Sequence, residues 1–256
     1  AEDGIRDDLV TGVQTCALPI LTLVGQTAWA SDEGQFVIGA AGLSASSIYT
    51  GASNTTKAVP DINYTKGSFA VGFREGVSYQ ISPSNESSIK LNLVPRFKPF
   101  DSDDSTILAN MSRKNTIDIG IKSRFQIKDV GSLKIELFKE LTDKHEGSLI
   151  DVSFGKFFMN DILPVSAALG SKWYSSERSK YHFGVHDSEA TADRAAYNPG
   201  AVLMPYFSVS TFYKFSEKLR AFGSVSMELL PSKVKDSPIV SGSTKSSFIV
   251  GFSHTF

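Results

Sequence analysis

The last eleven residues of the chain, SSFIVGFSHTF, alternate between two kinds of side chain. Phe248, Val250, Phe252 and Phe256 fall on every second position with His254, and mostly small or polar residues lie between them. A period of two places successive side chains on opposite faces of an extended strand. The segment is therefore predicted to be a β-strand with one apolar face.

Similar alternation recurs along the chain in segments of roughly ten residues. In the clearest segment, 115–128, Ile117, Ile119 and Ile121 alternate with charged and small residues. Segment 68–82 is either one long strand or two short strands separated by Arg74–Gly76. Splitting it gives twelve strands and merging weak early segments gives ten, so we predict twelve, with ten as the alternative. The segments are 35–49, 59–65, 68–82, 87–97, 115–128, 133–138, 150–158, 163–173, 207–215, 219–229 and 247–256.

The connections between these segments alternate in length. Those near residues 66, 84, 129, 160 and 216 are short, whereas those near 53, 105, 144, 188 and 238 are mostly longer. Short turns on one side and long loops on the other are typical of outer-membrane β-barrels. The predicted fold class is therefore an all-β, antiparallel, up-and-down transmembrane β-barrel.

The polar faces of the predicted strands carry charges of both signs. A Lys or Arg side chain that faces lipid costs about 2–4 kcal/mol at the bilayer midplane, so in a barrel these side chains must face the lumen. Twelve strands also enclose less space than the strands of the larger porins. We therefore expect ion pairs in a narrow or closed lumen, formed by Asp118, Lys122, Arg124, Lys134, Glu136, Asp151, Lys172, Arg220 and Glu228.

The first thirty residues are not expected to belong to the folded domain. Residues 1–20 have no apolar period and resemble the translation of a sequencing-library adapter, so we interpret them as a non-native prefix. Residues 21–30 resemble the end of a signal peptide, because an apolar stretch precedes the small-x-small sequence Ala28-Trp29-Ala30. The mature barrel domain is then expected to span residues 31–256.

Composition excludes some function classes once this segment is set aside. The single cysteine, Cys16, lies in the prefix, so residues 31–256 offer no disulfide and no thiol nucleophile. Residues 1–30 carry one basic and four acidic residues, which leaves 25 basic and 23 acidic residues and a net charge of about +2. This balance gives no sign of nucleic-acid binding. No run of 18 apolar residues predicts a transmembrane helix.

Three motifs in the second half make the chain similar to the MipA/OmpV family of outer-membrane proteins. They are YHFGV at Tyr181–Val185, AYNPG at Ala196–Gly200 and DSPIV at Asp236–Val240, and the resemblance covers about residues 35–256. It implies a barrel in the outer membrane of a Gram-negative bacterium, in contact with lipid and lipopolysaccharide. It also implies a non-enzymatic scaffold for murein hydrolase and synthase. A narrow channel and an adhesin or osmotic-response barrel remain alternatives.

Aromatic residues have two expected roles in such a barrel. An alternating last strand with a terminal aromatic residue resembles the signal that the barrel-assembly machinery reads, which assigns this role to Phe248, Val250, Phe252 and Phe256. Aromatic residues near strand ends are expected to form girdles at the two membrane interfaces. The candidates are Tyr64, Trp173, Tyr213 and Phe215.

Four histidines are the remaining candidates for chemistry. His182 and His186 are four residues apart, so helical spacing could pair them on a metal ion, but a polar external loop is the preferred interpretation. His145 is expected in a solvated turn and His254 on the apolar face of the last strand. Ser253 and His254 are neighbours in a strand and point to opposite faces, so they cannot form a Ser–His pair. We predict no catalytic, cofactor-binding or metal-binding residue and no enzymatic activity.

Overall fold

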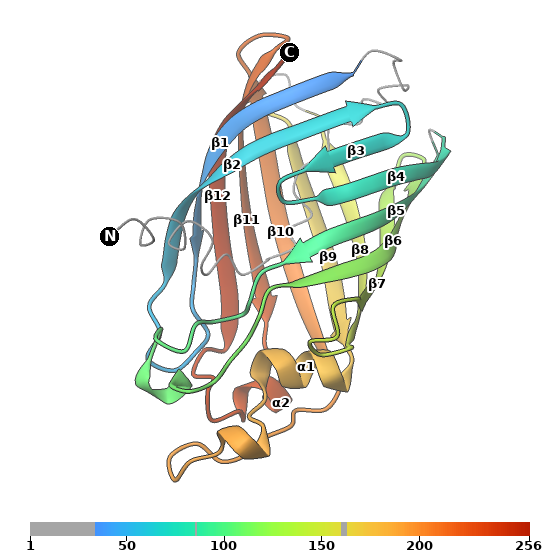
Figure 1. Cartoon of the computed structure of the whole chain (residues 1–256). Coiled ribbons are helices and arrows are strands. Elements are labelled where there is room, and N and C mark those ends of the chain that lie inside the picture. Colours follow the sequence, from blue (N-terminus) through green and yellow to red (C-terminus); the bar gives the residue numbers. More distant parts are fainter. Residues whose placement is uncertain (1–33, 85, 160–162) are drawn as a thin grey trace.

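The computed structural model describes residues 34–84, 86–159 and 163–256, so the predictions for residues 1–30 lie outside these ranges. Within them, twelve antiparallel strands form a closed barrel in which each strand pairs with its neighbours in the sequence and β1 pairs with β12 (Figure 1). The predicted count of twelve is confirmed, and the alternative of ten is wrong. No helix of the described part is long and apolar enough to cross a membrane.

The strands are joined by short turns at one end of the barrel and mostly by longer loops at the other. The C-terminus lies at the short-turn end, opposite the helices (Figure 1). The strands are β1 (Gln35–Ala45), β2 (Thr55–Lys66), β3 (Phe69–Gly72), β4 (Gly76–Pro83), β5 (Ser87–Arg96), β6 (Thr116–Ile127), β7 (Gly131–Glu140), β8 (Ser148–Phe158), β9 (Val165–Tyr174), β10 (Val202–Lys214), β11 (Leu219–Leu229) and β12 (Thr244–Thr255).

The long loops contain the helical segments of the described chain. Helix α1 (Ser176–Phe183) and a 3-10 turn at Asp187–Glu189 lie between β9 and β10. Helix α2 (Ser232–Lys235) lies between β11 and β12, and a second 3-10 turn, Thr106–Leu108, lies between β5 and β6. The helices therefore sit over one end of the barrel and not on its wall (Figure 1).

Strand β6 shows how the alternating sequence builds the wall. Its odd-numbered residues Ile117, Ile119 and Ile121 point outward and are 43%, 44% and 40% exposed, whereas Asp118 between them is 0% exposed. The same alternation runs through both neighbouring ladders, β5–β6 and β6–β7. Apolar side chains thus face outward, toward lipid, and polar side chains face inward.

Three strand boundaries differ from the sequence prediction by four or five residues. Strand β1 ends at Ala45, because Ser46–Tyr49 leave the wall and join the loops. Strand β2 begins at Thr55, within the stretch predicted to be a polar loop, because Thr55 pairs with Ala45 of β1. Strand β10 begins at Val202, five residues before the predicted start. Pairing with an existing neighbour extends a strand beyond its alternating segment.

Segment 68–82 forms two strands, β3 and β4, joined by a turn at 73–75. Gly76 at the end of this turn has φ +70°, a conformation that side chains with a Cβ rarely adopt. An ideal Cβ at Gly76 would lie 1.9 Å from the backbone oxygen of Leu93, so glycine also allows β4 to approach β5 closely. The β3–β4 hairpin is the shortest in the described wall.

Strand β12 closes the barrel between β11 and β1. It pairs with β1 from Thr255↔Val37 to Ser247↔Ala45 and with β11 along Thr244–His254. The backbone N–H of Phe256 donates to the carbonyl oxygen of Phe36 at 2.8 Å, and the two rings are 6.4 Å apart. The last strand is therefore part of the closed sheet on both of its edges.

Candidate functional site

The long loops pack into an apolar core over one end of the lumen, which we call the cap. Tyr49 meets Phe100 edge-on, with ring centroids 4.9 Å apart, and Leu108 and Val234 are 0% exposed. Removing this apolar surface from water holds four loops together. The cap residues are Ile48, Tyr49, Phe100, Leu108, Met111, Phe183, Val185, Val202, Met204, Leu230, Val234, Ile239 and Val240.

Arg113 ties two loops of the cap together by polar contacts. Its guanidinium donates to both carboxylate oxygens of Glu189, at 2.6 and 3.1 Å, and to the backbone oxygen of Tyr181 at 2.7 Å. Burial would raise the pKa of Glu189, but hydrogen bonds from Arg113 and from the His186 N–H outweigh it and lower the pKa. Glu189 is therefore ionised at neutral pH in a bidentate ion pair.

Asp118 on β6 connects the cap to the lumen wall. Its Oδ2 accepts hydrogen bonds from Arg96 Nε of β5 at 2.8 Å and from Arg178 Nη1 of α1 at 2.9 Å. Ser175 caps α1 by accepting the Arg178 N–H, which fixes the helix orientation. The side chains of Asp118, Arg96 and Arg178 are 0%, 8% and 4% exposed. Removing one partner of such a buried pair typically costs about 3–5 kcal/mol.

The other predicted lumen charges also lie on inward-facing positions, and the structure brings several of them together. The Lys172–Glu228 pair links β9 to β11 past β10, and Lys122 reaches the β3–β4 turn. Arg124 lies two residues beyond Lys122 on the same face of β6. The contacts are Lys122–Glu75 (3.0 Å), Lys134–Glu136 (3.0 Å), Lys172–Glu228 (3.2 Å), Tyr206–Asp151 (2.8 Å) and Arg220–Ser253 (2.9 Å).

One sector of the lumen is apolar. Val59 of β2, Phe222 of β11 and Ile249 of β12 are buried and pack together with Ala41 and Leu43 of β1. These inward-facing apolar residues are exceptions to the expectation that polar residues line the lumen. The lumen therefore has an apolar side formed by these residues of β1, β2, β11 and β12, and the buried charges of its strands lie mostly on β5–β9, with Glu228 of β11 as an exception.

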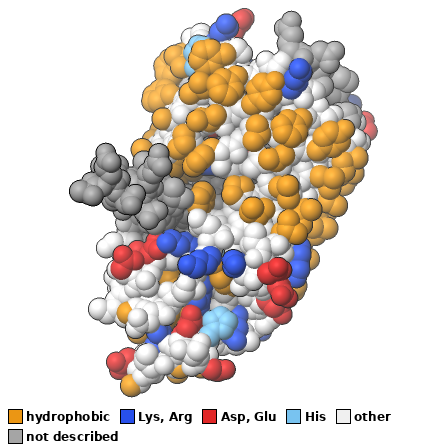
Figure 2. Space-filling model, viewed as in Figure 1, with side chains coloured by type: hydrophobic (Ala, Val, Ile, Leu, Met, Phe, Trp, Pro, Cys, Tyr) orange, Lys and Arg blue, Asp and Glu red, His pale blue; other side chains and the backbone are white. Residues whose placement is uncertain are grey.

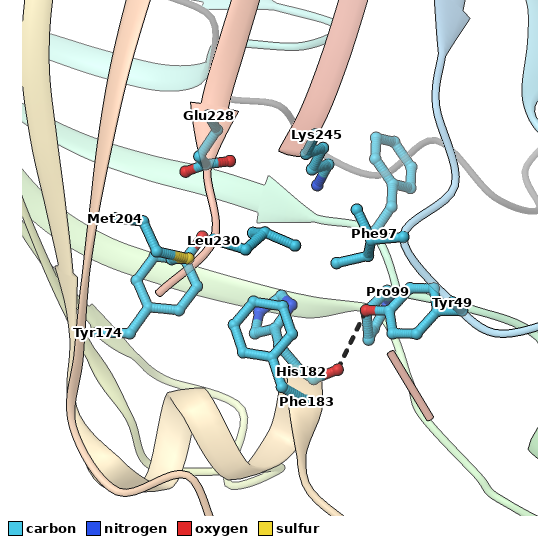
Figure 3. Close-up of a pocket in the computed structure, with 11 residues that line it drawn as sticks. Tyr49, Phe97, Pro99, Tyr174, His182, Phe183, Met204, Glu228, Leu230 and Lys245 are labelled. Carbon is cyan, nitrogen blue, oxygen red and sulfur yellow. Dashed lines mark hydrogen bonds between the residues drawn. The ribbon is translucent and has the colours of Figure 1, made fainter. Parts of the chain in front are cut away.

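A small cavity lies where the cap meets the lumen (Figure 3). His182 and Phe183 reach it from α1, and Glu228 and Lys245 reach it from the lumen side. Tyr49 Oη donates to the backbone oxygen of His182 at 3.0 Å. The cavity measures about 20 Å³, which is room for about one water molecule. Its size admits no organic substrate.

The histidines do not form the arrangements considered from the sequence. Helix α1 ends at Phe183, so His182 and His186 do not share a helical face. His145 lies in the turn between β7 and β8, as predicted, but it is only partly exposed, because its ring packs on Tyr181 with centroids 4.6 Å apart. Burial, with help from Arg178, lowers the pKa of His145 to about 4. No group of three potential metal ligands occurs among the residues that the structure describes.

The outward face carries the predicted membrane-facing residues. Apolar side chains form a belt over the face of the wall in Figure 2, and charged side chains gather toward the loop end. Trp173 lies at the loop end of β9 and is 36% exposed, while Tyr213 and Phe215 lie near the short-turn end. Phe248 and Phe252 point outward from β12, at 48% and 56% exposed. Tyr64 lies near Phe36, with ring centroids 6.5 Å apart.

Sequence reasoning missed the residues that organise the cap. Arg113 and Arg178 lie in segments that were interpreted as polar loops, and their partners are distant in sequence. Arg194 donates to the backbone oxygens of Ile107, Ala109 and Glu189. A usable signal was present: the aromatic and aliphatic residues of YHFGV within a polar stretch are unusual for a fully solvated loop.

Comparison with known proteins gives a family match and several relatives. The family model described as MltA-interacting protein MipA matches residues 38–256. The putative outer membrane protein YiaT of Escherichia coli K12 is 27% identical over 222 residues, covering 86% of this chain and 90% of YiaT. Outer membrane protein OmpV of Vibrio cholerae is 25% identical over 142 residues, or 55% of each chain.

Solved structures of outer-membrane barrels are also similar, at a low level. The NanC porin is 10% identical with a TM-score of 0.43, covering 85% of this chain and 98% of that one. The KdgM porin is 10% identical with a TM-score of 0.40, covering 87% and 99%. These values are too low to carry conclusions about lumen or activity. The protein is an outer-membrane β-barrel, as its own fold and its named relatives show.

Proposed function

The chain belongs to the MltA-interacting protein family, and from this premise we propose that it is a non-enzymatic scaffold of the cell envelope. In this proposal the barrel holds a murein-processing enzyme at the periplasmic surface of the outer membrane. The family description names an interaction with MltA, and a murein-processing partner for this chain is part of the proposal.

The observation that carries the proposal is the double closure of the lumen. The cap covers the loop end with an apolar core, and Arg178 reaches from α1 into the lumen to pair with Asp118. Near the loop ends of β9 and β11, Lys172 and Glu228 also connect strands that are not neighbours. A channel requires a continuous water path, whereas a scaffold requires only a stable barrel with exposed turns. The geometry favours the scaffold.

The short turns are the surface that a periplasmic partner would contact. They lie at the end of the barrel opposite the cap (Figure 1). Lys128 and Asp129 lie in the turn between β6 and β7, and Glu217 and Lys218 lie in the turn between β10 and β11. Because these turns are charged and exposed, they suit a polar, reversible protein contact.

Site-specific crosslinking in cells tests the scaffold. A photoreactive residue at Asp129 or Glu217 should capture a murein hydrolase or synthase. The matched control carries the same residue at Asp193, which is exposed in the β9–β10 loop, and should capture neither enzyme. Failure of both short-turn positions to capture a murein enzyme, with normal barrel levels, would contradict the proposal.

A narrow channel is the second candidate, and one observation favours it. The Glu75 side chain is 50% exposed although it pairs with the inward-facing Lys122. Space that water can reach therefore exists around the β3–β4 turn. Conductance of the purified barrel separates this candidate from the scaffold.

A further inference from the structure

The wall is interrupted between β2 and β5, on the cap side of the β3–β4 hairpin. Strand β3 pairs with β2 only along Asn63–Lys66, and one more hydrogen bond runs from the Phe73 N–H to the Ile62 oxygen at 3.0 Å. On the other side, β4 pairs with β5 only up to Leu93. Among the described residues, Thr55–Asp61 therefore have a ladder partner on β1 alone. In Figure 1, where the cap is drawn at the bottom, the hairpin ends partway along the wall between β2 and β5.

The interruption lies next to the cap, in the half of the wall nearest the long loops. Strand β2 runs on from Asp61 to Thr55, and β5 runs on to Arg96, before either enters the loops. Above it, Tyr49 of the loop before β2 packs on Phe100 of the loop after β5. The cap therefore closes the interruption at the loop end by joining the segments next to β2 and β5. The β3–β4 hairpin closes it at the other end.

A proline lies on each edge of the interruption. The Ile62 oxygen points toward β3, so Pro60, two residues earlier, presents its nitrogen to the same side. The Cδ of Pro95 lies 2.9 Å from the ideal Cβ position of Gly76, so its ring nitrogen also faces the hairpin side. An N–H without a partner in lipid is costly, and proline removes it. Proline on an edge also opposes the addition of another strand.

Cationic side chains face the lumen beside the β3–β4 hairpin, on the short-turn side of this interruption, where Lys90 pairs with Gln80 of β4. Lys90 of β5 and Lys122 of β6 are directly opposite each other in the ladder, and Arg124 follows on the same face. Like charges directly opposite each other destabilise a sheet, and Glu75 together with Glu136, which lies opposite Lys122 in the β6–β7 ladder, offsets this repulsion only in part. Lys122 contacts Glu75 at the hairpin turn, which places its ammonium group at the level of the interruption.

Apolar and small residues complete the surroundings. Val59 on β2 points inward to the apolar side of the lumen. On the outer surface, Ala40 of β1 and Ala58 of β2 are small and exposed, and Leu93 of β5 is exposed on the other edge. Asp61 also faces inward on β2 and accepts a hydrogen bond from Asn63 at 2.8 Å. Apolar surface outside and inside, together with this one carboxylate, thus adjoins the cationic cluster.

We propose that the interruption between β2 and β5 is a lateral port that admits a membrane lipid with a phosphate headgroup. The headgroup binds Lys90 and Lys122 in the lumen, and the acyl chains remain in the bilayer against Ala58 and Pro60. The anionic headgroup offsets the positive charge that Glu75 and Glu136 leave on the cluster, and the prolines keep the edges free of a pairing strand. This site is independent of the periplasmic scaffold surface.

Native mass spectrometry of the full chain, folded in vesicles and extracted into a neutral detergent, measures the lipid that stays bound. With equal phosphatidylglycerol and phosphatidylcholine, the wild type should retain phosphatidylglycerol selectively. The double variant Lys90→Gln/Lys122→Gln should lose this selectivity by about tenfold, since two charge-assisted hydrogen bonds are removed. The control Lys172→Gln/Glu228→Gln removes an ion pair from the same lumen on β9 and β11, away from the two lysines, and should keep it. Equal retention of both lipids, or unchanged selectivity in the lysine variant, would overturn the proposal.

Photocrosslinking locates the bound lipid. A photoreactive residue at Asp61, inward-facing beside the port, should crosslink phosphatidylglycerol, whereas one at Ser153 on the opposite inner wall should not. A gel-mobility shift on heating confirms that each variant is folded. Crosslinking at both positions, at neither position, or to a polypeptide instead of a lipid at Asp61 contradicts a lipid port.

Discussion

The wall and the cap of this barrel place their apolar residues on opposite sides. In the wall, Ile117 and Ile119 are more than 40% exposed on the outside, and Asp118 is fully buried between them. In the cap, Leu108 and Val234 are fully buried and the charged residues lie mostly at the surface. The wall is built for lipid and the cap for water. One chain therefore follows two rules of burial, according to the solvent that each part meets.

The two parts also differ in how contacts follow the sequence. Wall contacts join neighbouring strands in fixed register, so they are local and repeated. Cap contacts join distant residues, such as Arg113 to Glu189 and Tyr49 to Phe100. Asp118 belongs to both parts, because it binds Arg96 of the wall and Arg178 of the cap. Changes in one part should therefore be separable from changes in the other, except at Asp118.

Deletion of Phe256 should give the largest effect, because it affects the wall before the cap can form. The residue follows the closing strand and hydrogen-bonds to Phe36. We expect a severe loss of the protein from the outer membrane with export across the inner membrane intact, measured by fractionation and immunoblotting. Phe256→Tyr keeps an aromatic ring and should assemble. A normal outer-membrane level of the deletion variant would contradict the assigned assembly role.

Phe100→Ala should open the cap and leave the wall intact. Removing a buried phenylalanine side chain typically costs about 3–5 kcal/mol, and Phe100 is 2% exposed. We expect rapid proteolysis of the long loops, with the barrel still shifting in gel mobility on heating. Phe158→Ala, on the outside of β8, is the matched control and should leave the loops resistant. Equal loop cleavage in the two variants would show that the cap is not held by its core.

Ile121→Arg should destabilise the wall and not the cap. A charged side chain facing lipid near the bilayer midplane costs about 2–4 kcal/mol. Denaturant unfolding of the barrel in lipid vesicles measures this loss of stability. Lys122→Arg, one residue along and facing the lumen, should change stability by much less. If both variants unfold at the same denaturant concentration, the assignment of the two faces is wrong.

Acidic pH should loosen the cap more than the wall. Burial lowers the pKa of His145 to about 4, and it lowers the pKa of His182 strongly as well. Between about pH 6.5 and pH 4, the unfolded cap binds protons that the folded cap excludes, so cap stability falls as the pH falls through this window. Limited proteolysis at pH 7.5 and pH 5 should reveal faster loop cleavage at the lower value.

The double variant His145→Gln/His182→Gln is the control for this pH effect. It removes both titrating rings. The rate of loop cleavage should therefore differ less between pH 7.5 and pH 5 than it does in the wild type. Glu189 contributes little between pH 7.5 and pH 5, because its hydrogen bonds with Arg113 outweigh its burial and lower its pKa from an ordinary value that already lies below this range. A pH dependence unchanged by the double variant would contradict the role of the histidines.

The sequence predicted the wall well because strand alternation is a local signal. Period-two segments and alternating loop lengths were sufficient for the closed barrel of twelve strands. The boundaries of β2 and β10 were wrong, because pairing with a neighbour recruits residues such as Thr55 that lack an alternating pattern. The split of segment 68–82 was ambiguous by pattern and depended on the turn at Gly76.

The cap could not be predicted in the same way. Its apolar residues are scattered in ones and twos over four loops, without a period that identifies a face. Its ion pairs join residues far apart in the chain, as Arg178 and Asp118 do. The expectation of a polar loop around His182 rested on local composition, which does not report the distant residues that cover it. Only the three-dimensional arrangement reveals this core.

The central claim is that cap and charged lumen together close the barrel. Planar-bilayer recording of the purified wild type tests it most directly, with Phe100→Ala recorded under the same conditions. We predict no stable unit conductance for the wild type and intermittent openings for the variant, whose cap is weakened. Stable, reproducible unit conductance of the wild-type barrel would contradict the claim and would favour the channel.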